Sequence, residues 1–372
     1  MTDAPSTLGP AAAQLSQAAE RLLSPGEALL LLIVLTGAVF LGFSSVLAAW
    51  TLTYRGRKLD RERTLQDRAG RWKYQLREVL YGSSAPEALW SSVEEEDRID
   101  FLNFLVEYVR RLEGEERETI RELARPYLSE IVEYLHEPVE GRRVRAVQTL
   151  GELGLPDFAE PVIAALDDES DDVAMVAAST LAAAEDGKYA PAVLARLHRF
   201  NHWRQDFLVA MLASMGPQAA PALRTVLSDA SRTAKERTVA ADALSQLGDP
   251  AAADLAHDVL QASADVDLRA ATLRLLASVG RGEHVDAVRD AVADAALPVR
   301  LHAVRALGAL GEGPDLALLD RTARDDASPW VAIAAARALK EAGGSGQLEL
   351  LAGSEHPRAA LGLQVISEVR SW

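Results

Sequence analysis

The stretch PVRLHAVRALGALGEG, residues 298–313, begins with a proline, ends in glycines and holds a short Ala/Leu/Val-rich helix between them. Weaker copies of it recur along most of the chain. Aligned on the leucine of RAL, the copies place seven leucines at steps of 31, 31, 32, 32, 31 and 32 residues: Leu150, Leu181, Leu212, Leu244, Leu276, Leu307 and Leu339. A fixed period of this length predicts a repeat architecture.

Each copy has the pattern of a helix that buries one face. Apolar or small residues stand three before and three after each leucine, which marks one helical stripe. Four residues after the leucine stands a glycine in six of seven copies, and we expect these glycines to end the helix in the left-handed conformation. They are Gly154, Gly216, Gly248, Gly280, Gly311 and Gly343, with Glu185 in the remaining copy.

A first helix precedes each of these second helices, as in APALRTVLSDA at residues 220–230. A helix–turn–helix unit of about 31 residues cannot bury its apolar faces alone, so neighbouring units must stack. The sequence therefore predicts an all-α fold, a right-handed α-solenoid of about seven repeats.

Three of the copies resemble a known family. PVRLHAVRALGALG (298–311), DLRAATLRLLASVG (267–280) and KERTVAADALSQLG (235–248) are similar to bacterial HEAT repeats of the short phycobilisome-lyase type. The resemblance covers about residues 141–356. In that pattern an arginine opens the second helix seven residues before the leucine, as at Arg143, Arg237, Arg269 and Arg300, whereas Ala174, Gln205 and Ala332 depart from it.

The family includes enzymes, but the resemblance is specific for the fold and says little about function. Deoxyhypusine hydroxylase is a HEAT protein whose paired His-Glu dyads hold two irons; this chain has one such pair, His136–Glu137. The family's lyases attach bilins, and no site for that reaction is reproduced here. We therefore expect a protein that is not an enzyme, with no catalytic residue, no metal and no cofactor.

The composition of the chain argues against several further kinds of site and partner. The 372 residues contain no cysteine, which excludes disulfides and thiolate metal sites. The net charge of −16 argues against a nucleic-acid partner, because affinity for phosphates depends on Lys and Arg. His198 and His202 have a spacing that suits two metal ligands on a helix, but no third ligand joins them, so we expect a surface loop.

The N-terminal part of the chain predicts a membrane anchor. Residues 28–54 carry no charged side chain, and the apolar part, 28–49, would span roughly 33 Å as a helix. The alternative is a buried helix of a globular domain. Basic residues follow the segment, so we expect a single transmembrane helix at 28–54, an extracytoplasmic tail at 1–27 and a cytoplasmic C-terminal part, in the inner (cytoplasmic) membrane.

Residues 55–80 hold nine basic and four acidic residues, an excess of positive charge in an acidic chain. We expect a basic juxtamembrane helix at 55–85 that contacts anionic lipid headgroups; a solvated linker helix is the alternative. The residues expected at the membrane surface are Arg55, Arg57, Lys58, Arg61, Arg63, Trp72 and Tyr74. A helical N-terminal cap should follow at 86–140, and then the solenoid at 141–372.

One column of side chains predicts a binding surface. The position two residues before each leucine holds Gln148, Ser179, Ala210, Asp242, Arg274, Arg305 and Arg337. The three arginines, with His302 and Lys340 nearby, suit a partner segment that bears carboxylates or phosphates. The alternative is a solvated face with local salt bridges to Asp265, Asp267 or Asp325.

These features predict a membrane-anchored, non-catalytic scaffold whose cytoplasmic solenoid docks a protein partner at the inner membrane. Two alternatives remain open. One is an accessory or regulatory subunit of an inner-membrane enzyme, for example a glycosyltransferase. The other is a HEAT-type enzyme, a lyase or hydroxylase.

Overall fold

The computed structural model describes residues 33–44, 47, 67–184 and 187–368. The chain divides into two compact units, residues 1–101 and residues 102–372. All regular secondary structure within the described residues is helical. The all-α fold predicted from the sequence is thus confirmed for this part of the chain.

The first unit has a small core of its own. A helix over residues 67–80 precedes α3 (Pro86–Trp90), η1 (Glu95–Asp97) and the start of α4 (Arg98–Val109). The Trp72 ring meets the Phe101 ring edge-on, with 5.3 Å between centroids, and both side chains are buried. The carboxylate of Asp97 is also buried and pairs with Arg68.

The predicted transmembrane segment lies mostly outside the described residues. Within it the structure describes a helix over residues 33–44, and the side chain of residue 47 beyond it. None of the helices in the described ranges is both long enough and apolar enough to cross a bilayer. The tail at 1–27 also lies outside the described residues.

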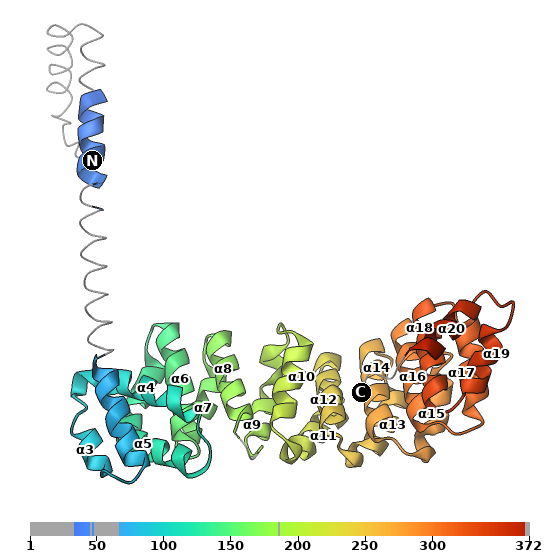
Figure 1. Cartoon of the computed structure of the whole chain (residues 1–372), viewed down its shortest axis with the longest axis horizontal. Coiled ribbons are helices and arrows are strands. Elements are labelled where there is room, and N and C mark those ends of the chain that lie inside the picture. Colours follow the sequence, from blue (N-terminus) through green and yellow to red (C-terminus); the bar gives the residue numbers. More distant parts are fainter. Residues whose placement is uncertain (1–32, 45–46, 48–66, 185–186, 369–372) are drawn as a thin grey trace, which may run out of the picture. The chain divides into compact units, whose positions relative to one another are not determined.

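The second unit is a succession of helix pairs (Figure 1). The first helices are α5 (Gly114–Glu133), α7 (Ala159–Ala164), α9 (Ala190–Ala195), α11 (Ala220–Ser228), α13 (Ala253–Ala262), α15 (Val285–Ala291), α17 (Asp315–Asp325) and α19 (Ser345–Ala352). The second helices are α6 (Glu140–Gly154), α8 (Asp171–Ala182), α10 (Gln205–Ser214), α12 (Ala234–Leu247), α14 (Val266–Val279), α16 (Leu297–Leu310), α18 (Pro329–Glu341) and α20 (Ala359–Ser367).

Stacking of these pairs forms two layers. In Figure 1 the second helices α6, α8, α10 and α12 follow one another in one layer, and the first helices α7, α9 and α11 in the other. Each second helix packs against the next, as α12 packs on α14 and α14 on α16. The helix α5, within the segment expected to be a cap, packs against α6 as α11 packs against α12 and α17 against α18.

The core lies between the layers, where the sequence period placed it. All seven aligned leucines, from Leu150 to Leu339, are fully buried in second helices. The residues three positions before them, such as Val304 before Leu307, are buried as well. The repeat assignment and the solenoid are therefore confirmed.

The glycines that end the second helices differ from the prediction. Gly216, Gly248 and Gly343 have φ values of 76°, 64° and 91°, as expected for left-handed caps. Gly280 and Gly311 instead have φ of −63° and −69° in extended backbone. A Cβ on either one would lie 2.4 Å from the carbonyl oxygen of the leucine four residues earlier. Close packing, rather than backbone handedness, accounts for these two.

Gly154 is a further correction, since it is the last residue of α6 and lies inside the helix. A Cβ there would meet the Phe158 ring at 3.0 Å. Glu185, the one exception to the glycine pattern, lies outside the described residues.

Candidate functional site

The fourth residue of the column on the second helices, Asp242, is a carboxylate that two neighbouring helices share. Asp242 of α12 accepts hydrogen bonds from Arg274 of α14, at 2.8 Å to Nε and 2.9 Å to Nη2. The side-chain amide of Gln205, on α10, donates to the same carboxylate at 2.9 Å. Three successive second helices are thus joined through Asp242, and the charge of Arg274 is matched within the fold.

His302 of α16 extends this contact to the next repeat. Its Nε2 lies 3.1 Å from Nη1 of Arg274. Burial, together with the positive charges of Arg274 and Arg305, lowers the pKa of His302 to about 4. A guanidinium only donates, so the neutral ring accepts at Nε2 and carries its own proton on Nδ1.

Arg305 stands apart from the other two arginines of the column. It is exposed on α16 and forms no ion pair with any residue that the structure describes. Its guanidinium is close enough to His302 to lower the pKa of the ring. The structure therefore brings Arg274, His302 and Arg305 together, and leaves Arg305 open to solvent.

The C-terminal end of the column is engaged in internal contacts. Arg337 forms a two-pronged ion pair with Glu368, at 2.9 Å and 2.7 Å, and this contact raises the pKa of Arg337 and lowers that of Glu368. Lys340 donates from Nζ to the carbonyl oxygens of Val365 at 2.6 Å and Glu368 at 2.7 Å. Lysine at this position satisfies the last carbonyls of α20.

The ammonium group of Lys340, which the sequence suggested for partner binding, thus makes its contacts with the end of the C-terminal helix. The salt bridges of the column also differ from the alternative weighed above. The carboxylates that pair with Arg274 and Arg337 are Asp242 and Glu368, and not Asp265, Asp267 or Asp325.

A groove of about 620 Å³ adjoins the column. It crosses α10, α12 and α14, and its lining residues are mostly polar: Arg204, Gln205, Asp206, Val209, Asp242, Ser245, Gln246 and Arg274. The sequence column contains Asp242 and Arg274 but not Arg204 or Asp206. Those two precede or begin α10, and the repeat period carries no signal for them.

The expected membrane-surface residues divide into three groups. Arg55, Arg57, Lys58, Arg61 and Arg63 lie outside the described residues. Tyr74 is exposed, with the guanidinium of Arg77 5.2 Å from its ring centroid. Trp72 is a correction, because its side chain is only 3% exposed and packs on Phe101 in the core of the first unit.

One group of potential metal ligands gathers in the described part of the chain: Asp254, Glu283 and His284. Arg281 binds both carboxylates, with 2.7 Å from Nη2 to Asp254 and 2.7 Å from Nε to Glu283. Nδ1 of His284 accepts from the backbone N–H of Arg281, so Nε2 carries the proton and donates to Asp254 at 2.9 Å. The guanidinium already supplies the positive charge that these carboxylates need.

The other histidines considered from the sequence belong to no such group among the described residues. His198 lies in η4 (Leu197–Phe200) and His202 in the turn that follows, both exposed. His136 ends η2 (Tyr134–His136), and Glu137 pairs with Arg142 at 3.3 Å.

Comparison with known proteins agrees with this architecture. Residues 255–340 match the HEAT repeats. These residues include α14, α16 and most of α18, where the period and the arginine column are clearest. No curated protein matches the chain.

Several solved structures are similar to the chain at low identity. The complex of CpcE and CpcF of phycocyanin lyase from Nostoc sp. is 18% identical over 64% of this chain and 86% of the other, with a TM-score of 0.31. Human deoxyhypusine hydroxylase is 19% identical over 67% and 98%, with a TM-score of 0.31.

The karyopherin Kap121p, bound to the extreme C-terminus of the protein phosphatase Cdc14p, is 13% identical over 74% of this chain. The chain spans 42% of the karyopherin's length, and the TM-score is 0.37.

Proposed function

We propose that this protein is a membrane-anchored, non-catalytic scaffold whose HEAT solenoid docks a protein partner. The observation that carries the proposal is the exposed residue Arg305, together with an open groove that Arg274 of the same column lines. Arg305 neighbours His302, which contacts Arg274, and Arg274 lines the groove. In our proposal one extended segment of the partner lies along the groove over α10, α12 and α14 and reaches Arg305 on α16.

The chemistry of this surface favours an acidic segment of the partner. An unpaired guanidinium at the surface gains charge-assisted hydrogen bonds when a carboxylate reaches it. The two-pronged geometry of arginine also selects carboxylates over neutral groups. The partner would lay its chain along the groove and place an acidic side chain on Arg305.

The anchor is the second part of the proposal. It rests on the uncharged segment at 28–54 and on the basic residues that follow it. The described part of this segment is helical, and its large apolar side chains, among them Leu35, Phe40 and Phe43, are exposed. In our proposal the solenoid is cytoplasmic, and anchoring raises the local concentration of the partner at the inner membrane.

Crosslinking tests the docking surface. The full chain is expressed in its native membranes, crosslinked there, and the captured proteins are identified by mass spectrometry. Arg305→Glu should lose the specific partner, whereas Arg145→Glu, a matched exposed arginine on α6, should retain it. Equal capture by wild type and Arg305→Glu would refute the docking surface.

The same experiment separates the scaffold from the alternative of an accessory subunit. A partner crosslinked to residues of α10 to α16 supports docking on the solenoid. An integral-membrane enzyme crosslinked to residues 28–54 instead supports the accessory subunit.

Topology is tested separately with a reporter phosphatase that is active only outside the cytoplasm. A fusion after residue 85 should be inactive, and a fusion at the N-terminus should be active, because positive charge holds the C-terminal flank inside. The reverse pattern would place the solenoid outside the cytoplasm.

A further inference from the structure

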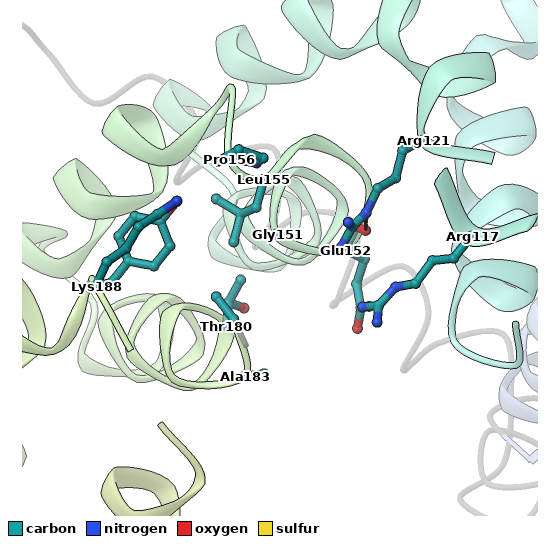
Figure 2. Close-up of a pocket in the computed structure, with 11 residues that line it drawn as sticks. Arg117, Arg121, Gly151, Glu152, Leu155, Pro156, Thr180, Ala183 and Lys188 are labelled. Carbon is teal, nitrogen blue, oxygen red and sulfur yellow. Dashed lines mark hydrogen bonds between the residues drawn. The ribbon is translucent and has the colours of Figure 1, made fainter. Parts of the chain in front are cut away.

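Two regions of the solenoid differ in how their charges are matched. Between α5, α6 and α8 lies a cavity of about 300 Å³, which Figure 2 shows. Its basic side chains are engaged within the repeats: Arg121 donates to the backbone oxygen of Glu152, and the ammonium group of Lys188 lies 4.9 Å from the centroid of the Tyr189 ring. Further along the chain, the turns that lead into α14, α16 and α18 carry acidic side chains that are not matched in this way.

Large apolar side chains are exposed in the first turn of the same three helices. Val266 of α14 and Leu297 of α16 are each 38% exposed, and Trp330 of α18 is 72% exposed. Each stands nine or ten residues before the aligned leucine of its repeat, so the three occupy nearly the same place in successive repeats. These three side chains form what we call the apolar edge.

Acidic side chains accompany the apolar edge. Asp265 and Asp267 flank Val266, and Asp325 is the last residue of α17, shortly before α18; all three are exposed. None of the three forms an ion pair with a residue in the described ranges, whereas the other two aspartates of these turns pair with arginines of the repeats. The turns along the edge therefore carry negative charge that the fold does not neutralise.

The spacing of the apolar edge suits an extended chain. Packed helices lie about 8–10 Å apart, and α14 packs on α16 as α16 packs on α18. An extended chain rises about 3.3 Å per residue, so every third side chain is about 10 Å further along. Three apolar residues at that spacing can each contact one member of the apolar edge.

We propose that the apolar edge docks an extended basic segment of a partner protein. The segment places an apolar side chain against each of Val266, Leu297 and Trp330, and its intervening lysines or arginines face the exposed aspartates. Contiguous exposed apolar side chains mark interaction surfaces, and the unmatched carboxylates select positive charge. The charge of this segment is opposite to that of the acidic segment proposed for Arg305, so the two surfaces take different ligands.

Binding of a fluorescein-labelled nonapeptide tests the proposal. The probe has leucine at positions 2, 5 and 8 and lysine elsewhere, and its control has the same composition with the three leucines adjacent. The full chain is held in phosphatidylcholine nanodiscs, and empty nanodiscs give the baseline for the fluorescence anisotropy. The probe should bind tenfold or more tightly than the control, because only the probe matches all three apolar positions.

Variants then assign the binding to the apolar edge. Trp330→Ala should weaken the probe about tenfold, since it removes the largest apolar contact. The double variant Asp267→Asn, Asp325→Asn should weaken it about fivefold, and less so at high salt. Matched controls on α19 are Leu350→Ala, which is also 72% exposed, and the exposed Glu349→Gln; both should bind the probe like wild type.

Equal affinity for the probe and its control would overturn the proposal, because it would reduce the binding to attraction between opposite net charges. Equal binding by wild type and Trp330→Ala would overturn it as well. A wild-type dimer in light scattering that Trp330→Glu dissociates would assign the edge to a second copy of this chain instead. Arg305→Glu should bind the probe like wild type, so the result does not depend on the docking surface.

Discussion

Arg300 of α16 forms a two-pronged ion pair with Asp326, which lies in the turn between α17 and α18 of the next repeat. The distances are 2.9 Å from Nε to Oδ2 and 3.3 Å from Nη2 to Oδ1. The remaining Nη1 donates to the backbone oxygens of Asp294 and Ala295 in its own repeat. The guanidinium of Arg300 therefore forms hydrogen bonds with the turns of two successive repeats.

The same contact recurs at the period of the chain. Arg143 binds Asp168 at 2.9 Å and 3.0 Å, and Arg269 binds Asp294 at 2.5 Å. The Asp168 carboxylate holds the pKa of Arg143 above its usual value. Each of the three aspartates also accepts the backbone N–H two residues later, which fixes the turn that presents it.

In two repeats that lack this arginine, a different arginine links the successive turns. Ala174 and Ala332 stand where Arg143 and Arg300 would be. In both cases an arginine of the following turn reaches back: Arg199 donates to the backbone oxygens of Leu166 and Asp168, both at 2.6 Å, and Arg358 donates to those of Ala323 and Asp326. In these two repeats the arginine that donates belongs to the neighbouring repeat, and hydrogen bonds still link the two turns.

The first prediction concerns this link. Arg300→Ala should lower the free energy of unfolding by about 2 kcal/mol, because it removes charge-assisted hydrogen bonds and leaves the nearly buried Asp326 without its cation. Urea denaturation followed by circular dichroism measures it. Arg305→Ala, on the exposed face of the same helix, is the control and should change stability by no more than about 0.5 kcal/mol. Equal losses would show that the link does not stabilise the fold.

The second prediction concerns a close contact between α16 and α18. A Cβ on Gly308 would lie 2.6 Å from the Cβ and 3.0 Å from the Cα of Ala338. Gly308→Ala should therefore force the two helices apart and destabilise the protein by about 1–3 kcal/mol, as overpacking does. A thermal melt measures the loss.

The matched control for Gly308 is Gly346→Ala in α19, where an added Cβ meets nothing within 4 Å. It should leave stability unchanged or raise it, since alanine favours a helix over glycine. A Gly308→Ala protein as stable as wild type would mean that α16 and α18 separate without cost.

The third prediction is a pH dependence. The pKa of His302 is about 4 in the folded protein and about 6.5 in an unfolded chain. The unfolded state then binds more protons between these values, so the contribution of His302 is complete above pH 6.5 and is lost as the pH falls toward 4. Solvent screening at this half-buried ring limits the loss to about 1 kcal/mol.

Urea midpoints at pH 7, 6 and 5 measure this effect. Carboxylates also contribute to acid sensitivity, so the comparison is the difference between wild type and His302→Gln at each pH. The difference should shrink as the pH falls. A difference that stays constant over this range would mean that His302 does not titrate as predicted.

The fourth prediction separates two arginines of the column. Arg274→Glu places a carboxylate beside Asp242, which is mostly buried, and should cost about 2 kcal/mol of stability. Arg305→Glu should cost no more than about 0.5 kcal/mol, because Arg305 is exposed and makes no ion pair in the described part of the chain. Differential scanning calorimetry of the two variants measures this. Similar melting temperatures would show that the Arg274–Asp242 pair adds nothing to the fold.

Periodicity in the sequence determined the repeat. Leucines 31 or 32 residues apart on one helical stripe can be buried together only if helix pairs stack, and all seven are buried. The same period located the arginines that open the second helices. Local sequence carried this information because each repeat contacts chiefly its neighbours.

Tertiary structure decided what those side chains contact. Arg300 pairs with a residue 26 positions away in the sequence. In the repeat where Ala174 replaces the arginine, Arg199 of the following turn makes the link between turns instead. The spacing of the arginines alone therefore does not identify their partners. Trp72 looked like a headgroup contact by its place in a basic segment, but it packs on Phe101. Burial and charge pairing depend on which helices meet, and that is set only when the repeats stack.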